Sequence, residues 1–201
     1  MDGNSVIGAI LDFWFGALDD SGLPRESRNA LWFRGGEAVD NAIRTQFAGD
    51  VEAAIAGERQ HWAETPDGTI ALVLLLDQFT RNIYRNTPAA FSGDAAALAL
   101  ARETVARGAD AAMPVIHRVF LYVPFEHAED RVAQEEGLAC FERLLRECPE
   151  PAREMVEGFQ RYMVAHRDVI AAFGRFPHRN AILGRTSTAA EAEHLAVHGG
   201  F

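Results

Sequence analysis

The stretch Thr69–Arg85 reads TIALVLLLDQFTRNIYR and joins a continuous apolar run to a dense polar cluster. The run Ile70–Leu76 is apolar on every side, which indicates a buried element. Its Leu-rich centre favours a helix, because strands prefer β-branched residues. The turn TPDG at Thr65–Gly68 precedes it, with Asp67 as the predicted N-cap. We therefore expect a buried helix around which the rest of the chain packs.

The polar end of this stretch carries Asp77, Arg81 and Asn82. Asp77 and Arg81 are four positions apart, so they meet on one face of a helix. Two interpretations are open. The pair could clamp the end of a buried helix, or it could line a pocket, because ion pairs of both kinds occur in proteins.

Composition bounds the class of protein. A chain of 201 residues with 48% hydrophobic and 24% charged residues predicts one globular domain covering 1–201. The net charge is −10, and all 19 basic residues are Arg. Such an acidic chain is a poor candidate for binding nucleic acid or an anionic membrane surface. The apolar run is also far shorter than the roughly 20 residues that a membrane span requires.

The two cysteines, Cys140 and Cys148, are expected on one helix, about 12 Å apart along its axis. That separation exceeds disulfide reach, and two unpaired thiols suit a reducing compartment. The start of the sequence lacks the basic-then-apolar pattern of a secretory signal. We therefore expect a soluble, cytoplasmic protein.

Helical periodicity recurs along the chain, which predicts an all-α domain of antiparallel helices. Ser92 is the predicted cap of one helix, and Pro124 is expected to break a helix or to start the next. Phe125–Cys148 is predicted as one long helix with a kink at Gln134–Gly137. Thr188 begins the last helix with Glu191 as its capping-box partner. Other predicted helices are Ser5–Phe15, Glu37–Phe47 and Ala152–Phe173, and the predicted core includes Leu72, Leu75, Phe79, Phe159 and His166.

The segment FEHAED holds the candidate catalytic residues His127, Glu129 and Asp130. On a continuous helix, His127 and Asp130 would share a face, which suits a metal site or a carboxylate-oriented histidine for proton transfer. The usual metal-binding spacings are missing, so no metal ligand is assigned. The alternative is an ion network in which Arg residues balance these acids.

A second polar concentration lies at Gly174–Thr186, GRFPHRNAILGRT. Pro177 could open a short helix there, and backbone donors beside guanidinium groups suit a phosphate or a carboxylate. The alternative is that these Arg residues neutralise the acids of FEHAED and LDQFTRN internally. The candidate ligand-binding residues in this segment are Arg175, His178, Arg179 and Asn180.

Several long motifs resemble the bacterial domain-of-unknown-function 924 family: LDFWFG, LDQFTRNIYR, FLYVPFEHAED, HRDVIAAFGRFPHRNAILGRTST and the closing GGF. The resemblance covers residues 6–201. Thr80 stands where the family pattern has Pro, Ala128 where it has Ser, and Ala189–Ala190 where Pro-Glu is usual. The resemblance implies a compact all-helical fold grouped with tetratricopeptide-like proteins, and it implies no activity.

Three hypotheses follow. The first is a cytoplasmic binding module for an anionic small molecule or a peptide carboxylate, with Asp77, Arg81 and Arg179 in the site. The second is an enzyme that uses His127 and a carboxylate as acid and base, with or without a metal. The third is a structural protein whose polar clusters are internal ion networks. The sequence identifies no cofactor and no oligomeric state.

Overall fold

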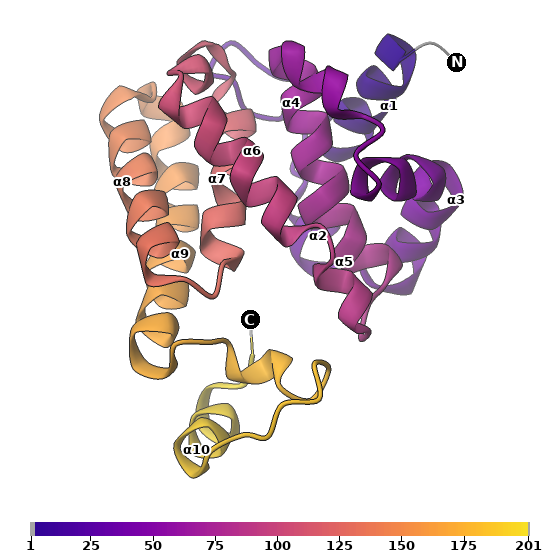
Figure 1. Cartoon of the computed structure of the whole chain (residues 1–201). Coiled ribbons are helices and arrows are strands. Elements are labelled where there is room, and N and C mark those ends of the chain that lie inside the picture. The colour runs from indigo at the N-terminus through magenta and orange to yellow at the C-terminus, as the bar shows by residue number, and fades with distance from the viewer. Residues whose placement is uncertain (1–2, 201) are drawn as a thin grey trace.

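The computed structural model describes residues 3–200, and the fold is all-α (Figure 1). Within those residues no β-strand forms, and a single isolated bridge joins Leu18 to Pro24. The predicted fold class is therefore confirmed. The helical elements are α1 (Gly3–Phe15), α2 (Asn29–Arg34), α3 (Gly36–Ile55), η1 (Gln60–Glu64), α4 (Pro66–Val73), η2 (Leu74–Phe79), α5 (Thr80–Ile83), η3 (Pro88–Phe91), α6 (Asp94–Ala106), η4 (Ala109–Ala112), α7 (Val115–His127), α8 (Arg131–Glu147), η5 (Glu150–Ala152), α9 (Arg153–Phe173), η6 (Pro177–Arg179) and α10 (Ala189–His198).

The helices form a bundle with a smaller C-terminal segment beside it. In Figure 1, α8 and α9 lie side by side at one end of the bundle, and α3 lies at the other. Helix α7 packs on α6, α8 and α9, while α4 contacts α1, α6 and α7. The segment that ends in α10 projects below the bundle, and α10 packs mainly on η6.

The stretch Thr69–Arg85 contains the centre of the core. Ile70, Leu74 and Leu75 are fully buried, as is Phe79. Every residue that we predicted for the core is buried, including His166, whose Nδ1 lies 2.8 Å from the backbone oxygen of Tyr162. Burial of large apolar side chains is the main favourable contribution to folding, so this stretch anchors the bundle.

The same stretch changes helical geometry half-way along. Between α4 and α5, the segment η2 (Leu74–Phe79) is π-helical. Such segments are rare and are often found at functional sites. Asp77 lies within it and is fully buried. The N-cap of α4 is Thr65 rather than Asp67, because the Thr65 hydroxyl accepts the Gly68 amide.

The prediction of one long helix over Phe125–Cys148 is wrong. Helix α7 ends at His127, and α8 begins at Arg131. The chain turns because Asp130 adopts an extended conformation and caps α8, accepting the Ala133 amide at 2.7 Å. The kink predicted at Gln134–Gly137 is replaced by this break, and α8 runs on through those residues.

Two smaller boundary predictions also need correction. Pro124 neither breaks nor starts a helix but lies inside α7, near its end, where the cost of one lost backbone hydrogen bond is tolerated. The cap of α6 is Gly93, not Ser92, whose hydroxyl instead bonds to the backbone oxygen of Ala89. The predicted capping box of Thr188 and Glu191 at the start of α10 is confirmed.

The C-terminal segment begins at Gly174, which ends α9 with a φ of 71°. Its buried Phe176 joins Val169 and Ile170 in a small apolar cluster separate from the main core. Both cysteines are buried and free, as expected. None of the helices in residues 3–200 combines the length and apolar character needed to cross a bilayer.

Candidate functional site

The site is built on a contact between His127 and Asp77, which are 50 positions apart. The Nδ1 atom of His127 lies 2.8 Å from Oδ1 and 3.0 Å from Oδ2 of Asp77. The π-helical segment η2 supplies Asp77, and the last residue of α7 supplies His127. A carboxylate can only accept, so Nδ1 donates, and Nε2 of the neutral ring carries the lone pair.

Asp77 is held as a carboxylate by its neighbours. Burial alone would raise the pKa of Asp77, but the charge of Arg81 and the hydrogen bonds from His127 and Gln78 outweigh burial and hold that pKa well below its ordinary value. Gln78 donates to Oδ2 at 2.6 Å, and Arg81 Nη1 lies 3.3 Å from Oδ1. The predicted contact between Asp77 and Arg81 is therefore confirmed, and Asp77 contacts both Arg81 and His127.

His127 remains a base rather than a cation. Burial and the nearby charge of Arg81 lower the pKa of His127, although Asp77 opposes that shift. The side chain keeps 16% of its surface exposed, so it is not sealed in the core. A neutral imidazole with its second nitrogen exposed is the form that accepts a proton at neutral pH.

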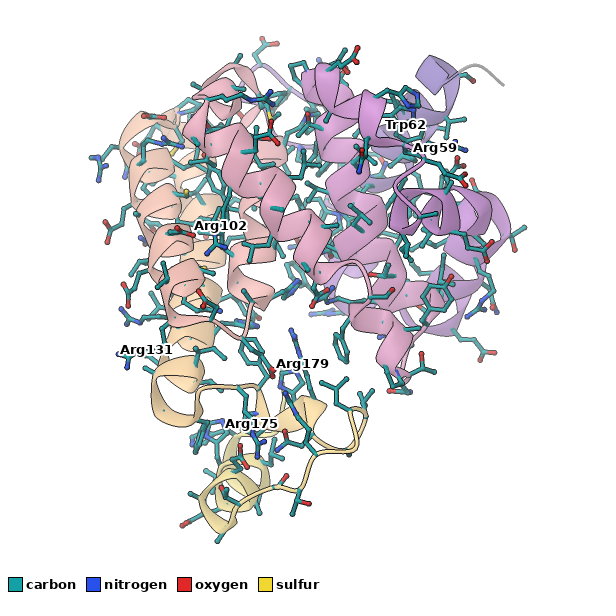
Figure 2. All side chains as sticks on the ribbon, in the orientation of Figure 1. Arg59, Trp62, Arg102, Arg131, Arg175 and Arg179 are labelled. Carbon is teal, nitrogen blue, oxygen red and sulfur yellow. The ribbon has the colours of Figure 1, made fainter. Side chains whose placement is uncertain are left out.

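A chain of alternating charges continues from Asp77. Arg81 donates to both carboxylate oxygens of Asp94, at 2.8 and 3.0 Å. Asp94 begins α6, where a carboxylate is favoured by the helix dipole. On its other side, Asp94 Oδ2 lies 3.5 Å from Nη1 of Arg179. Arg179 thus extends from the C-terminal segment toward the bundle (Figure 2), where it contacts the first residue of α6.

A pocket of about 320 Å³ opens between the bundle and the C-terminal segment. His127 and Arg179 both line it, so one bound molecule could contact the two side chains. Among the described residues, those in its wall include no Ser, Thr or Cys, and therefore no hydroxyl or thiol nucleophile. The lining residues are Phe91, Asp94, Ala95, Leu98, His127, Ala128, Glu129, Asp130, Arg179 and Leu183.

Behind the pocket lies a second buried acid, Glu126, which is 6% exposed. Its Oε1 lies 3.5 Å from Nδ1 of His166, and its Oε2 has no hydrogen-bond partner among the described residues. Burial and the charge of Asp77 raise the pKa of Glu126 to about 8. Glu126 is therefore largely protonated at neutral pH. The rings of His166 and His127 have their centroids 6.2 Å apart.

The other two candidate catalytic residues have structural partners. Glu129 accepts two hydrogen bonds from Arg185, at 2.6 and 2.8 Å, and one from the Phe176 amide at 2.7 Å. Asp130 caps α8. His127 and Asp130 do not share a helix face, because α7 ends between them. Both carboxylates line the pocket, but neither orients the imidazole.

The candidate ligand-binding residues fall into two groups. Asp77, Arg81 and Arg179 come together at His127. Asn82 instead donates to Asp40 at 2.8 Å on another face of the bundle. His178 lines a separate apolar cavity of about 410 Å³ between α9 and α10.

Two further candidates hold the C-terminal segment together. Arg175 makes a two-point contact with Glu191 at 2.6 and 2.9 Å. Asn180 donates to Ser187 at 3.0 Å and accepts from Arg185 at 2.9 Å. Pro177 does open a short helix, η6, as expected. The interpretation of this Arg-rich segment as internally neutralised is therefore correct for Arg185, whereas Arg179 reaches the pocket.

Sequence reasoning missed Asp94, Phe91 and the role of Glu126. Asp94 and Arg81 are 13 positions apart with a turn and η3 between them, so no helical spacing relates them. Glu126 directly precedes His127 in the sequence. Its closeness to other acids, which is unfavourable, is the feature of the sequence that could have indicated its role. No three His, Cys, Asp or Glu side chains in residues 3–200 are grouped so as to hold a metal ion.

Fold and site together define an all-α protein in which a buried Asp77 contacts a half-buried His127, at the wall of a pocket between a helical bundle and a C-terminal segment. The chain belongs to the family described as bacterial protein of unknown function (DUF924), whose model matches residues 10–199. It is similar to the solved structure of ATU0120, a protein of unknown function from Agrobacterium tumefaciens. The two share 34% identity over 96% of this chain and 98% of that one, with a TM-score of 0.77. No curated protein matches.

Proposed function

We propose that the pocket binds a small anionic molecule and that His127 exchanges a proton with it. The observation that carries this proposal is the contact between Asp77 and His127 at the pocket wall. It gives the imidazole one tautomer and one orientation, which is what a general base requires. The acid–base hypothesis, which the sequence left in second place, is therefore the better supported one.

Asp77 serves as the positioning residue in this proposal. It takes the Nδ1 proton and leaves Nε2 to face a ligand, and its charge stabilises the imidazolium that forms after proton transfer. Gln78 and Arg81 fix the carboxylate in turn. Such supporting contacts keep a catalytic group within the narrow geometry that proton transfer needs.

The binding-only hypothesis has support of its own. Arg179 is buried at the pocket and makes one long hydrogen bond to a carboxylate, so it is suited to an anionic group whether or not chemistry follows. The two functions differ at His127. A binding module needs Arg179 alone, whereas a proton-transfer site needs both side chains. Two free buried thiols support the further proposal that the protein works in a reducing compartment such as the cytoplasm.

The test is to incubate the purified protein with a bacterial metabolite extract and to follow each component by liquid chromatography and mass spectrometry. Wild type should consume or isomerise an anionic metabolite. His127→Gln keeps the size and polarity of the side chain but not its basicity, and it should slow the change by about 100-fold or more. Identical changes with wild type and His127→Gln, or no change with either, would reject the acid–base role. A ligand that co-purifies with both proteins unchanged would favour binding alone.

A further inference from the structure

Arg179 is held in an unusual environment for a guanidinium. Its side chain is 7% exposed and lies between two aromatic rings, 4.6 Å from the centroid of Phe91 and 4.5 Å from that of Phe176. Phe91 comes from η3 and Phe176 from the C-terminal segment. Contact with two rings restricts the guanidinium, whose N–H groups lie in its own plane and point outward at its edge.

The edge of that plane is poorly paired. The hydrogen bond from Nη1 to Asp94, at 3.5 Å, is the one that Arg179 makes with the described residues, and Nε is buried without a partner. By contrast, Arg81 and Arg185 each make two-point contacts with a carboxylate. Burial and the neighbouring Arg81 lower the pKa of Arg179 to about 10, so the side chain still carries its charge at neutral pH. A buried cation with spare donors is a site for an anion.

The surroundings of the pocket select among anions. Asp94, Glu129 and Asp130 line it together with Arg179, so acids already outnumber the bases at its wall. A doubly charged phosphate would meet strong repulsion from these carboxylates, whereas a single negative charge is more easily accommodated. The planar fork of a guanidinium also matches the two oxygens of a carboxylate.

The other side chains of the pocket wall indicate the size and polarity of the rest of the ligand. Phe91, Leu98 and Leu183 present apolar surface, and the volume of about 320 Å³ suits a small molecule. Recognition sites of this kind combine apolar walls with a few placed polar groups. A carboxylate at Arg179 would leave the apolar part of the ligand against these side chains.

We infer that the pocket takes a small monocarboxylic acid with a short apolar body, whose carboxylate is bound by Arg179 between Phe91 and Phe176. This inference rests on the proposed function, because it names the substrate class for the same pocket. It assigns Arg179 to binding and leaves the proton transfer to His127.

The experiment is isothermal titration of the full-length protein with acetate, butyrate, hexanoate and benzoate. Butyramide serves as the uncharged match and inorganic phosphate as the rival anion. Saturable binding of at least one carboxylate, tighter for the longer acids and absent for butyramide, is the expected result. Phosphate binding as tightly as the best carboxylate would overturn the inference, as would equal binding of butyramide or no saturable binding of any acid.

Variants locate the site. Arg179→Ala should weaken carboxylate binding by at least about tenfold. Arg161→Ala, which removes an exposed charge on α9, should leave it unchanged. Because loss of a buried side chain could unfold the segment, Arg179→Lys is the second variant: it keeps the charge without the planar fork, and it should also bind more weakly. Full binding by both Arg179 variants would overturn the inference.

The same titration separates the two proposals. His127→Gln should bind the carboxylate nearly as tightly as wild type does, because Arg179 binds the carboxylate group and His127 acts on another part of the ligand. If wild type bound a carboxylate but turned over no metabolite, the carboxylate site would stand and the acid–base role would be rejected. If wild type turned over a substrate that carries no carboxylate, the acid–base role would stand and the carboxylate inference would be rejected.

Discussion

Glu129 and Arg185 are 56 positions apart, and two hydrogen bonds of 2.6 and 2.8 Å join their side chains. Glu129 also accepts the backbone amide of Phe176, so one carboxylate holds the start of the C-terminal segment at two points. Burial would raise the pKa of Glu129, but the hydrogen bonds from Arg185 and Phe176 outweigh it and lower the pKa. Glu129 therefore acts as an anchor for the segment that brings Arg179 to the pocket.

Breaking this anchor should loosen the segment more than the bundle. Arg185→Ala removes two charge-assisted hydrogen bonds to Glu129, in a pair whose side chains are each 24% exposed, and also the hydrogen bonds to Asn180 and to the Phe176 carbonyl. We expect a loss of about 1–3 kcal/mol. Hydrogen exchange should rise between residues 175 and 190 and stay unchanged in α4. Glu129→Gln should cost less, because Arg185 keeps its hydrogen bonds to Asn180 and Phe176. The double variant should cost less than the sum of the two single variants, because both remove the same Glu129–Arg185 pair. Uniform acceleration of exchange in both regions would contradict this anchoring role.

Glu126 should give stability a distinctive pH dependence. The pKa of this carboxyl rises from an ordinary 4.5 to about 8, so the folded protein holds a proton that the unfolded chain releases. Its contribution to stability is full below pH 4.5 and is lost as pH rises toward 8. Glu126→Gln removes that loss. As pH rises, the variant should therefore gain stability relative to wild type, by up to about 1.4 kcal/mol in unfolding free energy per pH unit.

Urea titrations at pH values between 5 and 8 measure this difference. Other groups that face Glu126, such as Asp77, Arg81 and His166, are common to both proteins, so their titrations largely cancel in the comparison. A difference that stays constant with pH would show that Glu126 is ionised in the folded protein.

The fold was predictable where periodic patterns are long. The stripe of α9 and the capping box of Thr188 and Glu191 both follow from local spacing. The break after His127 was missed because EHAED contains neither Gly nor Pro. Asp130 could have located the break, because Asp is a common N-cap residue and its side chain accepts the amide three positions on.

The site was harder to predict because its pairs are distant in sequence. Spacing alone brought Asp77 and Arg81 together, since they share a helix. Nothing local shows that Asp77 would meet His127 rather than another cation, or that Arg179 would reach the pocket while Arg175 pairs with Glu191. Those choices depend on how helices pack, and the packing follows from the whole core rather than from any one motif.

Two glycines provide a matched test of packing around the central helix. A Cβ on Gly93 would lie 2.2 Å from the backbone oxygen of Leu76, so Gly93→Ala must push α6 away from η2. We expect a loss of about 1–3 kcal/mol or more. Gly49 of α3 is exposed, and a methyl group added there would have no heavy atom within 4 Å. Gly49→Ala should therefore stabilise the protein by about 0.5–1 kcal/mol, because Ala favours the helix.

Thermal and urea unfolding of the two variants measure both effects. Gly93→Ala should lower the free energy of unfolding and Gly49→Ala should raise it, although both replace Gly with Ala. If Gly93→Ala were neutral, α6 would not pack against Leu76 as closely as the structure shows.

The orientation of His127 should depend on Asp77, and nuclear magnetic resonance of the histidine ring nitrogens can measure it. In wild type, His127 should be the Nδ1–H tautomer, with a pKa below 6.5 because burial and Arg81 oppose its charge. Asp77 contributes more than Asp94 to raising this pKa, so Asp77→Asn should lower the pKa of His127 further and mix the tautomers, while circular dichroism confirms that the variant folds. Asp77→Asn should also slow any proton transfer by about 100-fold or more, with less effect on binding of a carboxylate. A His127 pKa that rises in Asp77→Asn, or a tautomer that does not change, would mean that the imidazole is held by its surroundings alone and that Asp77 serves only to balance Arg81.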